Sequence, residues 1–179
     1  MDWSTFLADQ LDTHTFSVMW YWIVVAVYWS MMGHWVMGVP FDVMFYARRY
    51  GGEMQTDFED LSHLNARRLA RFVDEGGYFM AGFSSFLLTS IAVMGFYYQK
   101  EFSQGLFFLL FPTFFVGLLT VRTAQKILRE DLRGERLYNR MWWQRVINQA
   151  IGLMAIIATA VWWLYLIYLS ILDEHYYGY

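Results

Sequence analysis

His34 is a titratable side chain inside an apolar stretch of the sequence, in SMMGHW. A neutral imidazole can ligate the iron of a haem or the magnesium of a bacteriochlorophyll. The small Ser30, one helical turn earlier, leaves room beside it for a flat ring. Ligation of haem by two histidines needs a second histidine at a similar depth, and the sequence offers no candidate. The alternative is a hydrogen bond to another helix or to lipid headgroups. His34 is therefore a candidate ligand for haem or bacteriochlorophyll, and no other cofactor is predicted.

The sequence contains few residues suited to other kinds of catalytic or metal-binding site. The 179-residue chain has no cysteine, which excludes disulfides, thiolate metal sites and cysteine nucleophiles. No Walker-type phosphate loop, HExxH motif or nucleophile elbow is present, and arginines in loops do not by themselves indicate nucleic-acid binding. Pumps and proton relays need ionisable side chains within the membrane, and the cores of the apolar stretches hold no Asp, Glu, Lys or Arg. The sequence predicts a protein that is not an enzyme.

Four apolar stretches are long enough to form the helices that position these residues. They cover about 16–39, 77–98, 105–121 and 146–172, and about 20 helical residues cross a bilayer. Hydrophobic residues make up 58% of the chain and charged residues only 16%, against about 25% charged in a soluble domain. We therefore predict an all-α membrane protein, one membrane domain over 1–179 with four transmembrane helices.

The positive charges of the chain are strongly segregated. Of the 13 Lys and Arg residues, all but Lys100 lie in the connections between spans one and two and between spans three and four. Short loops rich in Lys and Arg stay on the cytoplasmic side. Both basic connections are therefore expected in the cytoplasm, and both termini in the periplasm.

The basic connections are expected to be helical extensions of the spans. Thr56 and Glu59 match a capping box at a helix start, and the apolar residues that follow keep helical spacing as far as the second span, with the pair Gly76-Gly77 as a kink. Helical spacing also continues past the third span, and Gly134 is the expected turn before the helix of the fourth.

The N-terminal segment has an amphipathic pattern. Apolar residues share one helical face: Trp3, Phe6, Leu7 and Leu11. Such a helix can lie in the membrane interface, so we predict a short periplasmic amphipathic helix before the first span.

The run RTAQKILREDLRGERLYNR places a dense set of cations beside the membrane. Each can add about 1 kcal/mol of attraction to anionic headgroups, and the neighbouring acidic residues offset part of it. The predicted contacts to anionic phospholipids or to an acidic partner are Arg122, Lys126, Arg129, Arg133, Arg136 and Arg140. Topology together with surface ion pairs is the alternative explanation of the run.

Small residues recur along two of the spans. Such faces let helix backbones approach closely. The predicted packing positions are Ala81, Ser85 and Thr89 in the second span, and Gly152, Ala155 and Thr159 in the fourth. Pro112, in LLFPTFF of the third span, is either a local kink or part of a broken helix of the kind seen in transporters.

Five stretches of the chain carry a resemblance to a known group: MWYWIVVAVYWSMMGHWVMGVPFDV, ARRYGG, FEDLSHLNARRL, GFSSFLLTSIAVMGFYY and LLFPTFFVGLLT. Over about residues 1–130 the chain resembles small, uncharacterised alphaproteobacterial (Rhodobacter-like) membrane proteins, some of which carry the label "component of SufBCD complex". The resemblance implies a bacterial inner membrane. The label implies iron–sulfur assembly, but no functional residue is carried over, because this chain has no cysteine.

These observations favour a non-catalytic accessory or scaffold subunit of the membrane, which binds other membrane proteins or further copies of itself. An oligomeric channel or transport component, with Pro112 and hydroxyl side chains facing a pore, is the first alternative. A pigment- or haem-binding subunit that uses His34 is the second.

Overall fold

The protein is almost entirely helical in the computed structural model, which describes residues 19–177 and their side chains as far as Leu172. Its elements, in chain order, are α2 (Met19–His34), β1 (Trp35–Val36), β2 (Val39–Pro40), α3 (Phe41–Tyr50), α4 (Gly52–Ala92), the π-helical turn η1 (Val93–Tyr97), α5 (Glu101–Arg129) and α6 (Gly134–Tyr177). The predicted all-helical class is confirmed for this part of the chain. The predicted N-terminal amphipathic helix and residues 16–18 lie outside it.

Within the described residues, three helical segments are long and apolar enough to cross a membrane: Gly52–Tyr97, Glu101–Arg129 and Gly134–Leu172. They extend well beyond the spans predicted from hydropathy. At 1.5 Å per residue the 44 residues of α6 are about 66 Å long, roughly twice the ~30 Å of a hydrocarbon core. The helices therefore continue past the apolar layer, as predicted for the basic connections.

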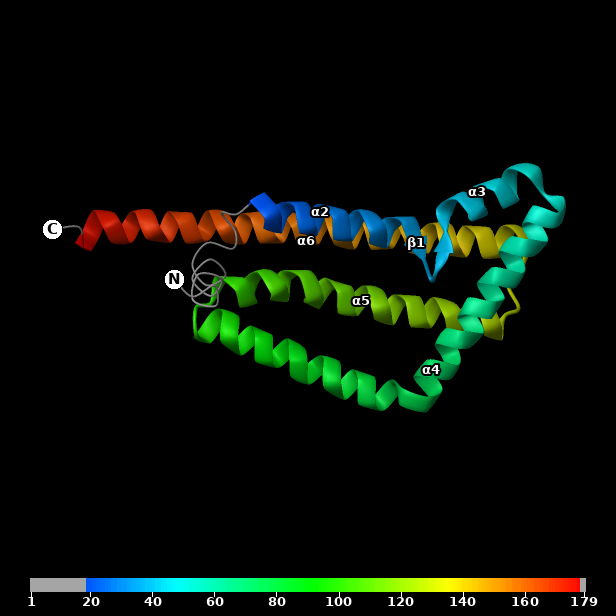
Figure 1. The fold of residues 1–179 in the computed structure, drawn as a ribbon, viewed down its shortest axis with the longest axis horizontal. Coiled ribbons are helices and arrows are strands. Elements are labelled where there is room, and N and C mark those ends of the chain that lie inside the picture. Colours follow the sequence, from blue (N-terminus) through cyan, green and yellow to red (C-terminus); the bar gives the residue numbers. More distant parts are fainter. Residues whose placement is uncertain (1–18, 178–179) are drawn as a thin grey trace, which may run out of the picture.

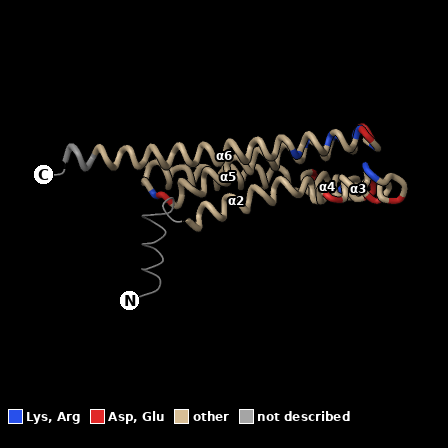
Figure 2. Tube along the Cα trace, turned by 90° about the horizontal axis from the view of Figure 1, so that it is seen from above, with Lys and Arg blue, Asp and Glu red and all other residues tan. Residues whose placement is uncertain are grey.

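The long helices lie side by side, and their charges gather at one end. Figure 1 shows α2 running along α6, while α5 lies between α6 and the second half of α4. In Figure 2 most of the charged residues that are drawn lie at the end where α3 and the beginnings of α4 and α6 meet. We call this end, made by residues 41–75 and 122–145, the charged end of the bundle.

A β-hairpin ends the first apolar stretch, and here the predicted boundary at residue 39 is wrong. The helix stops at His34, and Trp35–Val36 pairs with Val39–Pro40. Met37 and Gly38 form the two-residue loop with φ of 53° and 73°, the left-handed pair that a tight hairpin turn needs. Gly38 accepts this conformation without strain. The hairpin buries Val36 and Val39.

Helix α4 begins earlier than the capping-box pattern predicted. Its first residue is Gly52, after Gly51 with φ of 62°, and the hydroxyl of Thr56 donates to the carbonyl of Gly52 at 3.4 Å instead of capping a new helix. The capping-box prediction is therefore wrong. Figure 1 shows a sharp bend about midway along α4, the part of the helix that contains the predicted kink at Gly76-Gly77.

The largest buried core lies at the charged end and not between the spans. It joins residues of the hairpin, α3, α4, α5 and α6: Val36, Val39, Met44, Ala47, Phe58, Ala66, Ala124, Ile127, Leu132, Leu137 and Met141. A smaller core between α2, α5 and α6 consists of Val25, Trp29, Val116 and Ala155. The two connections thus form a packed body of their own that holds the helices together.

Candidate functional site

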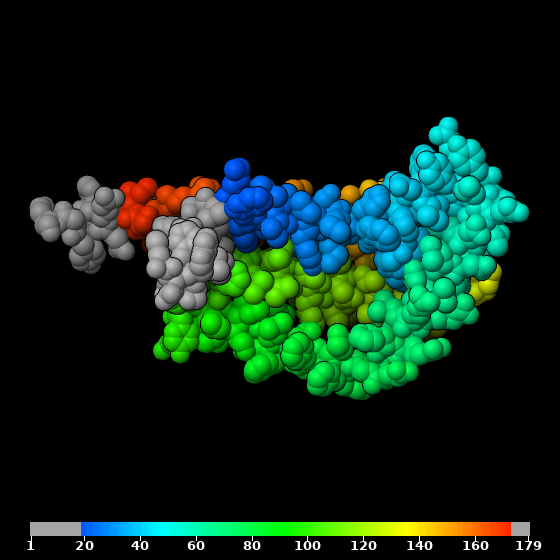
Figure 3. Space-filling view, in the orientation of Figure 1, coloured from blue at the N-terminus to red at the C-terminus, as the bar shows by residue number. Residues whose placement is uncertain are grey.

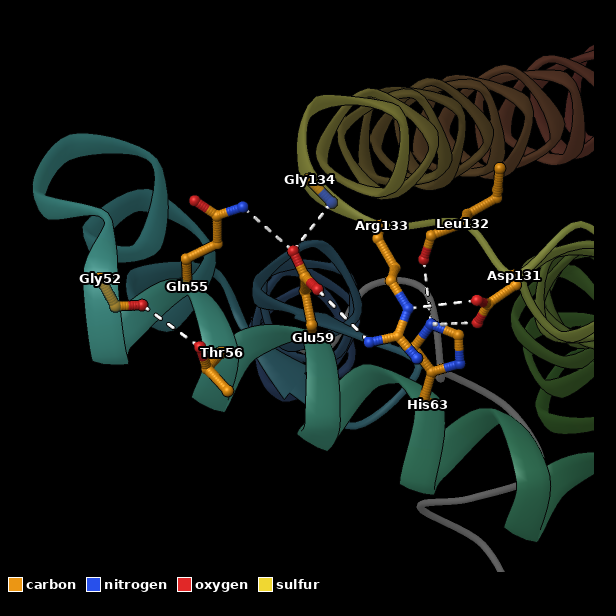
Figure 4. A network of polar contacts seen from close by, with 9 residues as sticks. All are labelled: Gly52, Gln55, Thr56, Glu59, His63, Asp131, Leu132, Arg133 and Gly134. Carbon is orange, nitrogen blue, oxygen red and sulfur yellow. Dashed lines mark hydrogen bonds and ion pairs between the residues drawn. The ribbon is translucent and has the colours of Figure 1, made fainter.

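A carboxylate of α4 caps the beginning of α6 at the charged end. Glu59 accepts a hydrogen bond from the backbone N–H of Gly134 at 2.9 Å (Figure 4). A negative charge at this place also complements the positive end of the helix dipole. Gly134 is the predicted turn, with φ of 55°. Gln55 donates to the same carboxylate oxygen at 3.0 Å, and Arg133 lies 3.9 Å from the other. Glu59 thus ties the two basic connections together.

His63 makes the second link across the same interface. Its Nε2 lies 2.9 Å from the carbonyl oxygen of Leu132 and 3.8 Å from a carboxylate oxygen of Asp131 (Figure 4). A hydrogen bond from Arg133 at 3.2 Å holds the pKa of the Asp131 carboxyl below its usual range, with a smaller contribution from His63. No local pattern pointed to a role for His63, because its partner is a backbone carbonyl 69 residues away.

A buried polar seam continues from the charged end between α5 and α6. Arg140 donates to the hydroxyl of Thr123 at 3.0 Å, and that hydroxyl donates to Gln144 at 2.6 Å. Gln144 then donates to Asn148 at 3.0 Å. Thr123, Gln144 and Asn148 are all buried. Arg140, one of the predicted lipid contacts, therefore points its guanidinium into the bundle.

The other predicted contact residues of the basic run differ in their surroundings. Lys126 pairs with Glu130 at 3.8 Å, and Arg133 with Asp131 at 3.2 Å. Three further arginines are exposed and form no ion pair within the described part of the chain: Arg122, Arg129 and Arg136. Arg122 also lines an apolar groove of about 590 Å³ between α5 and α6. Of the six predicted contact residues, these three arginines are the ones whose charges are exposed and unpaired within residues 19–172.

The two stripes of small residues have different surroundings. On α6, Gly152, Ala155 and Thr159 are buried. A Cβ on Gly152 would lie 2.7 Å from Cε3 of Trp29, so this stripe receives α2 within the protein. On α4, Ala81, Ser85 and Thr89 are exposed.

The outer side of the second half of α4 is an exposed apolar surface. Phe79, Phe83 and Phe86 share one exposed side of the helix, and the small stripe lies next to that side around the helix axis. Ala81, at the edge of the stripe, also lines a groove of about 520 Å³ toward α2 and α5. The rings of Phe79 and Phe83 stack with their centroids 6.3 Å apart. In Figure 3 this part of α4 forms the lower rim of the molecule. We call the surface of Phe79, Ala81, Phe83, Ser85, Phe86 and Thr89 the α4 face.

His34 lies at the end of α2, exposed and beside Trp35, whose ring centroid is 6.3 Å from that of the imidazole. It lines a hollow of about 370 Å³ together with Arg145 and Gln149 of α6. The polar neighbours of His34 in this hollow thus include the guanidinium of Arg145 and the amide of Gln149. The described residues contain no group of three or more His, Cys, Asp or Glu that could hold a metal ion.

The hydroxyls near Pro112 form hydrogen bonds with neighbouring groups. Thr113 donates to the carbonyl of Leu109 at 2.7 Å, and the hydroxyl of Tyr28 lies 2.8 Å from the same Thr113 oxygen. Thr120 likewise donates to the carbonyl of Val116 at 2.8 Å. These hydroxyls satisfy the backbone of α5 and a helix neighbour.

Comparison of the chain with protein-family models, with curated proteins and with solved structures finds no match.

Proposed function

We propose that this protein is a non-catalytic accessory or scaffold subunit of a bacterial inner membrane. In this proposal it binds other membrane proteins, or further copies of itself, through the α4 face. The observation that carries the proposal is the contrast between the two small-residue stripes. The stripe on α6 is filled by Trp29 of α2, whereas the equally small stripe on α4 stays accessible.

A four-span topology goes with this proposal. The 16 described residues of α2 contain no Asp, Glu, Lys or Arg and cover about 24 Å, and α2 lies along α6 (Figure 1). With α2 as the first span, the charged end faces the cytoplasm, because it carries all but one of the 13 Lys and Arg residues. Both termini then lie in the periplasm, and the exposed arginines of α5 and α6 meet anionic phospholipids.

The α4 face suits a protein partner better than lipid alone. Small residues let a second helix approach closely, and van der Waals packing is the main attraction between helices in lipid. The exposed aromatic side chains beside the stripe add a large contact area. Close approach to acyl chains needs neither feature.

The pore alternative has less support in this fold. The hydroxyls of Thr113 and Thr120 already donate to carbonyls of their own helix, so neither offers a free O–H donor to an aqueous path. The pigment alternative depends on His34, and an absorption spectrum of the purified protein tests it directly.

Cysteine cross-linking tests the proposal, because the chain has no cysteine of its own. Ser85→Cys places one thiol on the α4 face, and Ala158→Cys places one on an exposed position of α6 as the matched control. If the protein self-associates, oxidation of the Ser85→Cys variant in native membranes is expected to give a defined cross-linked species. If the partner is another protein, a photo-cross-linker attached to the thiol at position 85 is expected to give a defined adduct.

The bulky variant Ala81→Phe provides the second half of the test. Combined with Ser85→Cys, it is expected to abolish the species cross-linked through position 85, while Ala158→Phe leaves that species unchanged. Equal cross-linking from positions 85 and 158 would contradict the role of the α4 face. So would a species from position 85 that survives Ala81→Phe.

A further inference from the structure

The hollow beside His34 contains the guanidinium of Arg145. It lies between α2 and α6 and has a volume of about 370 Å³. Its polar groups are Ser30 and His34 of α2 and Arg145 and Gln149 of α6. In the described part of the chain Arg145 forms no ion pair, and its Nε is enclosed without a hydrogen-bond acceptor.

An aromatic ring fixes the position of this guanidinium. The Cζ atom of Arg145 lies 3.5 Å from the ring centroid of Phe41, at the beginning of α3. Stacking on one face of the guanidinium leaves its edge, with the N–H donors, free for an anion. A planar fork of donors matches the oxygens of a phosphate.

The hollow lies at the boundary between the charged end and the apolar bundle. Arg145 is the last charged residue of α6 before the uncharged stretch 146–172. A Cβ on Gly33 would lie 3.1 Å from Cγ of Gln149, so the end of α2 is level with this boundary. Phosphate groups of a lipid leaflet occupy the corresponding depth of a bilayer, at the edge of the hydrocarbon core.

Exposed apolar residues lead away from the hollow on both helices. On α2 they are Ile23, Val27 and Met31, spaced four residues apart, and Met31 lines the hollow itself. On α6, Leu153 and Ile157 continue the line of Arg145 and Gln149 at the same spacing and are also exposed. A ligand with a phosphate head and apolar chains meets matching surfaces along its whole length.

We propose that this hollow binds the phosphate group of an anionic phospholipid, with Arg145 as its charged contact, Gln149 and His34 beside it, and the acyl chains along α2 and α6. The site is distinct from the exposed arginines of the basic run. It requires the helices to lie in a membrane but not the partner-binding role of the α4 face, so either proposal can fail without the other.

Thermal unfolding of the full chain in detergent tests the site. Wild-type protein is titrated with phosphatidylglycerol, phosphatidylcholine or inorganic phosphate, and the shift in unfolding midpoint gives an apparent affinity. Phosphatidylglycerol is expected to raise the midpoint. Arg145→Gln is expected to weaken its apparent affinity at least about tenfold, the loss typical of a charge-assisted hydrogen bond.

Two further variants separate this site from general charge and from misfolding. Arg68→Gln removes the same charge from an exposed position of α4, where no lipid contact is proposed, and should change the affinity far less. Ser30→Trp fills the hollow without changing charge, and should reproduce the loss even if Arg145→Gln fails to fold. Undiminished binding in Ser30→Trp, or equal losses in the two arginine variants, would overturn the proposal. An equal effect of inorganic phosphate would overturn its assignment to a lipid.

Discussion

The indole Nε1 of Trp162 donates a hydrogen bond to the side-chain oxygen of Gln104 at 2.9 Å, joining α6 to the beginning of α5. The amide of Gln104 in turn donates to the carbonyl of Gly95 at 2.8 Å. A Cβ on Gly95 would lie 3.0 Å from the backbone nitrogen of Gln104, so glycine is what allows this approach. Three helical segments thus share one buried amide at the end of the bundle opposite the charged end.

Replacement of Gln104 by leucine should destabilise the bundle, because it leaves the Gly95 carbonyl and the Trp162 N–H without this partner. The expected loss is about 1–2 kcal/mol of unfolding free energy. Trp162→Phe keeps a ring against Phe96 and should cost less. A double-mutant cycle of the two changes, measured by unfolding in detergent, should show coupling of roughly 0.5–1.5 kcal/mol. Additive effects would mean that the hydrogen bond contributes nothing.

Loss of the Glu59 carboxylate should loosen the beginning of α6. Glu59→Ala removes the acceptor of the Gly134 N–H and is expected to lower stability by about 1–2 kcal/mol, as for the loss of a helix cap. Glu59→Gln keeps an acceptor oxygen and should lower the stability less than Glu59→Ala does. Glu75→Ala is the matched control, since Glu75 is exposed on the same helix. Thermal unfolding measures all three, and equal effects of Glu59→Ala and Glu75→Ala would exclude the capping role.

A methyl group at Gly152 should push α2 away from α6. Its Cβ would lie 2.7 Å from Trp29, and overpacking of this kind costs about 1–3 kcal/mol. Gly117→Ala in α5 is the control, because nothing lies within 4 Å of a Cβ there. In that helix alanine should be neutral or stabilising. Unfolding midpoints that move equally in the two variants would show that α2 does not depend on this contact.

The charge of Asp131 should contribute to stability only above the acidic range. Its pKa is lowered in the folded protein, first by the hydrogen bond from Arg133. A depressed carboxyl pKa stabilises the fold above its unfolded value of about 3.9 and loses that contribution as the pH falls through the folded value. The thermal unfolding midpoint of Asp131→Asn should therefore be lower than that of the wild type at pH 7. The difference between the two midpoints should narrow below about pH 4. Asp57→Asn controls for the loss of one charge, and a difference that stays constant with pH would contradict the effect.

Local properties of the sequence determined the helices and the segregation of charge. Apolar runs with helical spacing specify spans wherever they stand, and Gly134 breaks α5 from α6 through its own left-handed backbone, φ 55°. The positions of the arginines in the sequence were likewise enough to predict one charged end, without information on their spatial neighbours. Two predictions from local patterns were wrong. The end of the first apolar stretch forms a hairpin at Gly38 instead of continuing as a helix. Glu59 caps α6 instead of its own helix.

Only the tertiary structure decided which of several similar residues acquire partners. Glu59 and Gly134 are 75 residues apart, and Gln104 and Trp162 are 58 apart, so no local pattern connects them. The stripe at Gly152 receives Trp29 while that at Ser85 stays open, although the two look alike in sequence. Lipid solvates both apolar helix faces equally well, so the hydrophobic effect does not determine which of the two faces is buried against another helix. The choice depends on close packing and on hydrogen bonds between distant residues.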